Sequence, residues 1–335
     1  MCKHFFHIGY PKAASTSLQK NLFAESPNLV NLGLYPTSNI GNDALTNQPD
    51  NIPYLKDERI RQLYQAISLS GSLEFDLEST KKLWDQIRSD YEALDRRCLK
   101  KSIILSHESI TSARFANPSL LEKASRIRDI FGPIRIIIVT RRQQDVLKSL
   151  YRDHPFDPRT MESRPRPVNF NEWLEIDLSR ASLSVAHSLY FDRLLYLYEK
   201  LFGKENILVL PMELMQLNLE SFSGALSKFM GIDSNSTFRL LNRPPQNTSV
   251  SGLGNRYRVL KARYAPKLSL IKPLKAPLLK FDRYVFGHLK KIGRPPSVNI
   301  SSQHENLLFN LYAKSNTNLS RDYDLSLDSL GYYVE

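Results

Sequence analysis

The run of residues 134–140, IRIIIVT, constrains the fold of this chain more than any other stretch. Its residues are almost all β-branched, it follows Gly132 and Pro133, and a helical pattern comes after it. Strands buried on both faces have this composition, whereas strands with one wet face alternate apolar and polar residues. The run therefore predicts a central strand of a parallel sheet.

Other apolar runs, within residues 4–8, 102–109 and 206–211, predict three more buried strands. Segments with apolar residues at helical spacing separate the four runs. These segments cover residues 57–70, 78–97, 118–131, 142–153, 170–180, 185–202 and 218–230. Strands that alternate with helices predict a parallel sheet covered on both faces. We therefore expect one α/β domain over residues 1–335, with a sheet of four to five strands flanked by helices.

Two stretches rich in Pro, Asn and other polar residues, 26–55 and 154–169, predict irregular loops. We expect the second to lie on the surface. Ligands of open α/β sheets bind outside the carboxyl ends of the strands. We therefore expect these two loops to line the pocket for a substrate there.

Residues 4–23, HFFHIGYPKAASTSLQKNLF, predict a strand, a tight loop and a helix. The Gly-Tyr-Pro sequence breaks the strand, and Lys12 lies in the loop. Ser15, Thr16 and Ser17 are typical N-cap or first-turn residues. Free N–H groups at a helix start, three hydroxyls and one Lys are suitable donors for a phosphate or sulfate group. The alternative is an ordinary strand-turn-helix with a solvated Lys.

The order of these loop residues differs from the GxxxxGK[ST] pattern of nucleotide kinases, because Lys12 precedes the hydroxyl residues. The order resembles the 5′-phosphosulfate loop of sulfotransferases, PK[ST]GTT. These enzymes use 3′-phosphoadenosine 5′-phosphosulfate (PAPS). The resemblance implies that the cofactor-binding residues of the loop are Lys12, Ala13, Ala14, Ser15, Thr16 and Ser17. Ala14 replaces the glycine of many members, so the loop must avoid positive φ there or accept strain.

A second motif, RRQQDVLKSLY at residues 141–151, begins where the strand at 134–140 ends. Sulfotransferases carry R-x-x-x-D-V-x-x-S-x-Y after their third core strand, and its Arg and Ser hold the 3′-phosphate of PAPS. The matching residues here are Arg141, Asp145, Val146, Ser149 and Tyr151. The resemblance implies that Arg141 and Ser149 bind this phosphate, whose oxygens suit an Arg fork. The alternative is an amphipathic helix with solvated charges.

The polar residues after the second predicted strand are candidates for a catalytic base. His107 and Glu108 stand side by side, and sulfotransferases place a His or a Glu in this region. The resemblance favours Glu108, because members that use Glu have a short polar run after it, as Glu108-Ser109 is here. A carboxylate desolvated in a cleft can have its pKa raised towards a useful range. Adjacent side chains usually point apart, so we expect one of the pair to face the site. The alternative for each is a structural role at a strand end, and we interpret His4 and His7 as structural.

The C-terminal part of the chain has a looser resemblance to bacterial sulfotransferases. PMELM at 211–215 resembles the stretch after their fourth strand, and DLSLDSLGY at 324–332 resembles their usual end. The resemblance also places Arg243 and Asn247 at PAPS, although most loop residues have no such role. It implies a P-loop-like fold with a helical, basic C-terminal extension.

Composition excludes several other classes of protein. Cys2 and Cys98 are the only cysteines, which are too few for a disulfide scaffold or a Cys-based zinc site. The sequence contains no run of about 20 apolar residues, so it predicts no membrane span. The predicted phosphate loop begins within ten residues of Met1, so we expect no signal peptide and a cytoplasmic location.

The net charge of +12 is concentrated between Arg256 and Arg294, where twelve Lys and Arg residues face a single acid, Asp282. The rest of the chain is close to neutral, so we expect no nucleic-acid partner. Prolines such as Pro266 exclude one long helix in this segment. The basic amphipathic segment 256–294 either lies on an anionic membrane surface or attracts an acidic acceptor. A Lys-rich solvated cover over the core is the third interpretation.

These features and the resemblance together predict a PAPS-dependent enzyme that requires no metal. We expect it to transfer the sulfuryl group to an acceptor hydroxyl on a carbohydrate or glycolipid and to release adenosine 3′,5′-bisphosphate. By analogy with phosphoryl transfer, positioning and electrostatics supply most of the catalysis. One alternative is a nucleotide-dependent kinase, which the missing Walker lysine and Mg²⁺-binding acid disfavour. The other is a catalytically silent nucleotide-binding or membrane-associated scaffold.

Overall fold

A computed structural model describes most of the chain and groups it into two compact units. The described residues are 4–32, 57–94, 102–111, 118–159, 166–243, 251–268, 284–289, 292–293 and 296–335, without the side chains of 92–94, 108–109 and 261–268. The first unit contains residues 1–142, 190–246 and 313–335, and the second contains 143–189 and 247–312. The single domain expected over 1–335 stays a prediction.

The first unit is built on a five-stranded parallel sheet, which confirms the predicted α/β class. Its strands are β1 (His4–His7), β2 (Leu29–Asn31), β3 (Ser102–Ser106), β4 (Arg135–Thr140) and β5 (Ile207–Pro211), in the order β2-β3-β1-β4-β5. Phe6 of β1 is paired with Leu105 on one side and with Ile136 on the other. The carboxyl ends of β3, β1 and β4 therefore lie next to one another.

Strand β2 lies in the stretch 26–55 for which the sequence predicted only irregular loop. That prediction was wrong at Leu29–Asn31, which add an edge strand beside β3. Three residues are too few to show a strand period, and the pairing with β3 determines their conformation. Most of the remaining stretch, residues 33–56, lies outside the described residues.

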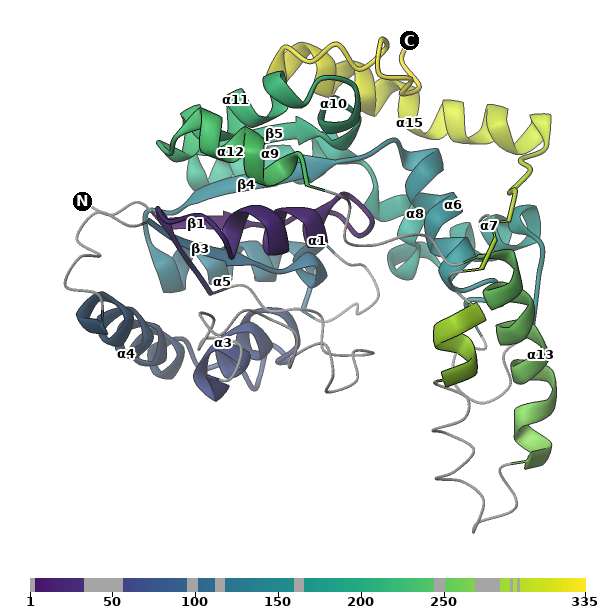
Figure 1. Ribbon diagram of the computed structural model, residues 1–335, viewed down its shortest axis with the longest axis horizontal. Coiled ribbons are helices and arrows are strands. Elements are labelled where there is room, and N and C mark those ends of the chain that lie inside the picture. The colour runs from purple at the N-terminus through teal and green to yellow at the C-terminus, as the bar shows by residue number, and fades with distance from the viewer. Residues whose placement is uncertain are drawn as a thin grey trace. The chain divides into compact units, whose positions relative to one another are not determined.

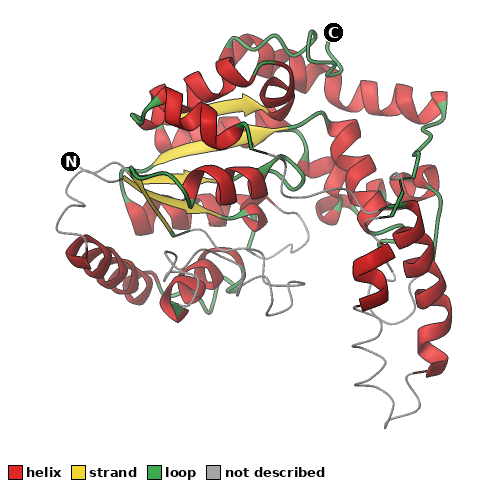
Figure 2. Cartoon of the chain, viewed as in Figure 1, coloured by secondary structure: helices red, strands yellow, loops and turns green. Residues whose placement is uncertain are grey.

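Helices cover both faces of this sheet, as Figures 1 and 2 show. Successive side chains of a strand point to opposite faces, and β1 follows this rule. The Phe6 ring packs against Tyr64 of α3 (Glu58–Ser68) and Phe131 of α5 (Leu120–Phe131). The rings of Phe5 and His7 pack on the other face, against α11 (Leu219–Met230) and the π-helix η1 (Leu18–Phe23).

The helix boundaries follow local signals in most places. A capping box between Ser119 and Glu122 starts α5, and Gly132 with φ 64° ends it. The first unit also contains α4 (Leu77–Leu94), α9 (Phe191–Phe202), α10 (Met212–Leu217) and α12 (Ser234–Leu241). The single helix predicted over 185–202 was wrong, because Tyr190 leaves the helical region with ψ 89° and separates α8 (Val185–Ser188) from α9.

The second unit contains α6 (Gln143–Asp153), α7 (Phe170–Leu178), α8, α13 (Gly252–Leu268) and the first part of α15 (Ser302–Tyr323). The fully buried carboxylate of Asp177 at the end of α7 accepts hydrogen bonds from the Ser184 hydroxyl and from the backbone N–H of Ala186, both at 2.9 Å. These bonds connect α7 to the start of α8. Helix α13 runs through Pro266 and ends two residues later.

The stretch 154–169 was predicted to be a surface loop, and this prediction was wrong at Asp157. Asp157 is buried, and its carboxylate pairs with Arg159 at 2.8 Å and with Arg166 at 3.0 Å. A β-bridge between Phe156 and Pro167 closes the loop beside these pairs. The sequence contained the required charges, but their spacing did not reveal a pairing across the loop.

Candidate functional site

The loop after β1 forms the centre of the candidate site. The backbone N–H of Ile8 donates to Ile137 at 3.0 Å and that of Tyr10 donates to Val139 at 3.4 Å, so the chain stays beside β4 past the end of β1. The chain then turns sharply, with φ 68° at Lys12 and φ 59° at Ala14. A side chain in this left-handed region costs about 1–2 kcal/mol. Of the two possibilities left open for Ala14, the loop takes the strained one.

Ala14 precedes helix α1 (Ser15–Ser17), which continues into the π-helix η1. The prediction of Ser15, Thr16 or Ser17 as first-turn residues is confirmed, but none of them is the N-cap. The N-cap residue is Ala14, and its side chain makes no capping hydrogen bond. The three hydroxyls therefore belong to the first turn beside the loop.

The two predicted phosphate motifs meet at this loop. Arg141 follows β4, and its Nη1 donates a hydrogen bond of 2.8 Å to the backbone carbonyl of Lys12. Both residues are half-buried. The strand order explains the contact, because β1 and β4 are neighbours and their carboxyl ends share one edge. Arg141 and Lys12, from segments 129 residues apart, thus meet at a strained loop at this edge.

His107 lies at the same edge, directly after β3. Its backbone N–H donates to the carbonyl of His7 at 3.1 Å, and its half-buried ring stacks on Tyr64 with a centroid distance of 4.7 Å. Burial, and then the charge of Lys123, lower the pKa of His107 to about 4. The imidazole is therefore neutral at pH 7, in the form that accepts a proton.

Glu108 begins a short 3₁₀ helix, η4 (Glu108–Thr111), directly after His107. Its side chain lies outside the described residues, so its assignment as the base stays a prediction. Thr111, at the end of η4, donates from its hydroxyl to the carbonyl of Gly9 at 3.2 Å. This bond holds η4 against the start of the loop.

A buried polar cluster under the loop was missed by the sequence analysis. Nδ1 of His7 lies 2.8 Å from the hydroxyl oxygen of Ser106, and this oxygen accepts a hydrogen bond of 2.8 Å from the Gln19 amide. Within the described part of the chain, the buried Nε2 of His7 and hydroxyl of Ser15 have no hydrogen-bond partner. A histidine between apolar strand residues was the one signal in the sequence, and we had interpreted His7 as structural.

The looser C-terminal motifs also come together at this edge. Glu213 of the PMELM sequence is buried and accepts hydrogen bonds from the Tyr332 hydroxyl at 2.8 Å and from the backbone N–H of Arg142 at 3.0 Å. The Tyr332 hydroxyl also lies 3.3 Å from that of Thr140, the last residue of β4. Burial, followed by the charge of Glu213, raises the pKa of Tyr332. This cluster fixes the backbone on both sides of Arg141.

The other predicted cofactor residues are placed less directly. Ser149 lies in α6, which belongs to the second unit, so its position relative to the loop stays a prediction. Arg243 follows α12, is exposed and pairs with Glu25 at 3.6 Å. Asn247 lies outside the described residues. Among the described residues, no group of three or more His, Cys, Asp or Glu side chains could hold a metal ion.

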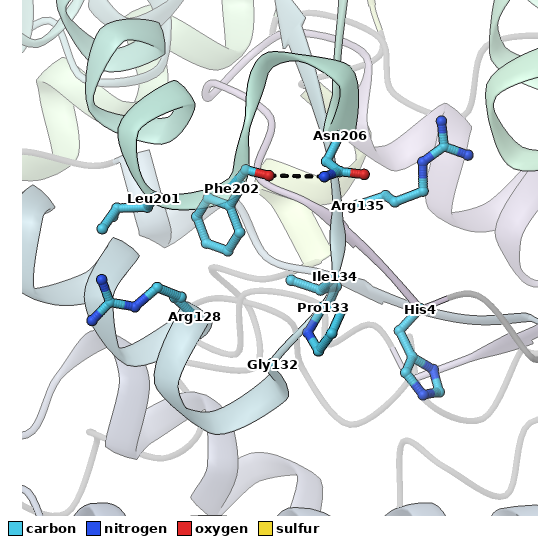
Figure 3. A pocket seen from close by; sticks show the side chains of 9 residues that line it. All are labelled: His4, Arg128, Gly132, Pro133, Ile134, Arg135, Leu201, Phe202 and Asn206. Atoms are coloured by element: carbon cyan, nitrogen blue, oxygen red, sulfur yellow. Dashed lines mark hydrogen bonds between the residues drawn. The ribbon is translucent and has the colours of Figure 1, made fainter.

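The opposite edge of the sheet has a pocket of about 780 Å³ (Figure 3). It is lined by residues at the amino ends of the strands, including His4 of β1 and Ile134 before β4. Its Arg135 lies over the Phe229 ring at 3.7 Å and donates to the carbonyl of Phe229. The pocket and the loop therefore lie at opposite ends of β1 and β4, and the pocket does not contribute to the candidate site.

Comparisons with known proteins give a likeness to sulfotransferases at low similarity. No family model and no curated protein match the chain. A sulfotransferase from Alicyclobacillus acidocaldarius matches with 14% identity and a TM-score of 0.43, over 82% of this chain and 96% of that one. Mouse sulfotransferase SULT7A1 complexed with PAP matches with 14% identity and a TM-score of 0.35, over 78% of this chain and 66% of that one. The sulfotransferase domain of the Synechococcus PCC 7002 olefin synthase matches with 14% identity and a TM-score of 0.39, over 73% of this chain and 78% of that one.

TM-scores below 0.5 at 14% identity are too low to support conclusions about function. The function therefore has to be argued from the sequence motifs and from the geometry of the loop.

Proposed function

We propose that this protein is a sulfotransferase that transfers the sulfuryl group of PAPS to an acceptor hydroxyl. The observation that carries the proposal is the hydrogen bond from Arg141 to the Lys12 carbonyl. It brings together two motifs that resemble the sulfotransferase pattern independently. A chance match at either motif would not require the two to meet at one edge of the sheet.

The residues at this edge suit a donor that has two separate anionic groups. Lys12 and the Ala13–Ser17 segment would hold the 5′-phosphosulfate, and Arg141 would approach a second phosphate. The buried Ser15 hydroxyl has no partner within the described residues, as expected for a donor that serves a ligand. PAPS supplies the activated sulfuryl group, and the transfer that we propose uses no metal.

The transfer forms one bond to sulfur and breaks another. The acceptor oxygen bonds to sulfur, the bond from sulfur to the phosphate oxygen breaks, and that oxygen leaves with the electron pair. Lys12 would stabilise the charge that develops on the leaving oxygen. The acceptor proton goes to a base, for which we favour Glu108 and keep the neutral His107 as the alternative.

We further propose that the acceptor is a carbohydrate or glycolipid hydroxyl and that the enzyme acts in the cytoplasm, in part at an anionic membrane surface. The looser resemblance to bacterial sulfotransferases supports the acceptor class, and the basic segment 256–294 supports the surface. The second unit exposes Leu253, Leu260 and Ile292 in and beside this segment, and such residues can enter a lipid interface. No described helix is long and apolar enough to cross a membrane.

The proposal is tested by following adenosine 3′,5′-bisphosphate release from PAPS with a panel of glycans, glycolipids and simple alcohols. We expect Glu108→Ala to lower turnover by roughly 10²–10⁴-fold, the usual contribution of a general base, and to leave bisphosphate binding nearly intact. His107→Ala is the matched comparison at the neighbouring position. A wild-type protein that binds the bisphosphate but sulfates no acceptor of any class would favour the silent scaffold.

A further inference from the structure

His7 occupies an unusual place for a histidine, at the end of the central strand β1. Its side chain is fully buried on the face of the sheet that η1 covers, with its ring 5.6 Å from that of Phe23. Phe5, the preceding residue on the same face, is apolar, and a second apolar residue would have filled the position of His7. The polar ring therefore needs an explanation.

The hydrogen bonds around His7 allow its ring hydrogen to lie on Nε2. The Gln19 amide donates to the Ser106 hydroxyl oxygen, and the hydroxyl hydrogen of Ser106 can point at Nδ1 of His7. We take Nδ1 as the acceptor of this pair. Burial lowers the pKa of His7 to about 3, so the ring is neutral. A neutral imidazole whose Nδ1 accepts carries its hydrogen on Nε2.

This Nε2–H donor lies against the start of the loop. A Cβ atom built on Gly9 would lie 2.7 Å from Nε2 of His7 and 2.9 Å from the Ser15 hydroxyl, so only glycine fits there. Both atoms are buried, and neither has a partner within the ranges that the structure describes. Buried polar atoms almost always have a partner. Two adjacent donors without one suggest an acceptor from outside the chain.

We propose that Nε2 of His7 and the Ser15 hydroxyl both donate hydrogen bonds to one oxygen of the anion that the loop binds. This inference rests on the proposed function and adds a donor that neither sequence motif contains. An anionic oxygen accepts only, so it satisfies both groups at once. A neutral donor also avoids placing a second full charge in the buried space behind Lys12.

The first test is nuclear magnetic resonance of the His7 ring nitrogens in the wild-type protein. We expect a protonated Nε2 and an unprotonated Nδ1, and a shift of Nε2 when adenosine 3′,5′-bisphosphate is added. Adenosine 3′-monophosphate, which has no 5′ anion, should leave Nε2 unchanged. Protonation on Nδ1, or bisphosphate binding without a shift of Nε2, would overturn the inference.

The second test uses two amides of different length. In His7→Gln an N–H group can reach the position of Nε2, whereas in His7→Asn the amide reaches only as far as Nδ1. We expect His7→Asn to weaken bisphosphate binding about tenfold and His7→Gln to bind within about twofold of wild type, with folding of both checked by circular dichroism.

The outcomes of these tests separate the two proposals. Equal affinities for His7→Asn, His7→Gln and wild type would overturn the role of His7 and leave the proposed function standing. A wild-type protein that binds no bisphosphate would overturn the proposed function itself, and the inference would fall with it.

Discussion

At the scale of single residues, the loop after β1 combines strain with buried polarity. Lys12 and Ala14 have positive φ, and Gly9 is the one residue of the turn that must lack a side chain. Backbone strain of this kind persists where surrounding contacts determine the conformation, and it concentrates at binding sites. Here the hydrogen bonds to the carbonyls of Gly9 and Lys12 provide those contacts.

Ala14→Gly should relieve strain and stabilise the fold. Glycine removes the cost of about 1–2 kcal/mol at φ 59° but adds about 0.4–1 kcal/mol of unfolded-state entropy. We expect the free energy of unfolding in urea to rise by about 0.5–1 kcal/mol. Ala13→Gly, at a buried neighbour without positive φ, should lower it instead. A decrease of similar size in both variants would contradict the strained conformation.

The two buried or half-buried histidines at this edge make stability depend on pH. Burial lowers the pKa of His7 to about 3 and that of His107 to about 4, both below the unfolded value of 6.5. Between pH 4 and 6.5 the unfolded chain binds more protons, so the free energy of unfolding rises with pH there. As the pH falls below 6.5, we expect each histidine to lower the free energy of unfolding by up to about 1.4 kcal/mol per pH unit.

Urea midpoints measured between pH 7 and 5 test this prediction, because most carboxylates stay ionised in that window. In His7→Gln the free energy of unfolding should depend less steeply on pH, since the Gln amide does not titrate. A His7→Gln slope equal to that of wild type would show that His7 does not contribute.

At the scale of elements, sequence reasoning succeeded where the signal was local. The four predicted strands and the helix over 118–131 have apolar runs or clear caps, and they form as expected. Strand β2 and the break at Tyr190 were missed because tertiary contacts determine them. For the site, the sequence placed Lys12 and Arg141 in motifs that each follow a predicted strand, but only the three-dimensional packing shows the cluster around His7.

The contact among β4, α10 and the C-terminal segment makes a prediction at this scale. Tyr332→Phe removes one buried hydrogen-bond donor from Glu213, and hydrogen bonds to charged groups are worth about 1.5–3 kcal/mol. We expect the free energy of unfolding in guanidinium to fall by about that amount. Tyr196→Phe, at an exposed tyrosine of α9, is the control and should have no effect. Equal stabilities of the two variants would contradict the role of this contact.

At the scale of the whole molecule, the positive charge is distributed unevenly along the sequence. Segment 256–294 carries nearly all of the +12 net charge, and its described part exposes Leu260 and Ile292. Electrostatic attraction to anionic lipid weakens with salt, whereas insertion of apolar side chains does not. The salt dependence of lipid binding therefore separates the electrostatic contribution to that binding from the apolar one.

Sedimentation with anionic vesicles tests the membrane interpretation. We expect binding at low salt, partial loss at high salt, and weaker binding at both for Leu260→Ser. Leu121→Ser, at an exposed leucine of α5 in the first unit, is the matched control. No binding at low salt would remove the membrane and leave the acidic acceptor or the solvated cover.

The anion site that we propose at Lys12 and Arg141 is tested most directly by calorimetry. Wild type, Lys12→Ala, Arg141→Ala and the control Arg128→Ala, at the opposite edge of the sheet, are titrated with adenosine 3′,5′-bisphosphate and with ATP. We expect tight bisphosphate binding and weak ATP binding by wild type and Arg128→Ala, and at least tenfold weaker bisphosphate binding by the other two variants. No bisphosphate binding, or a preference for ATP with Mg²⁺, would contradict the sulfotransferase proposal.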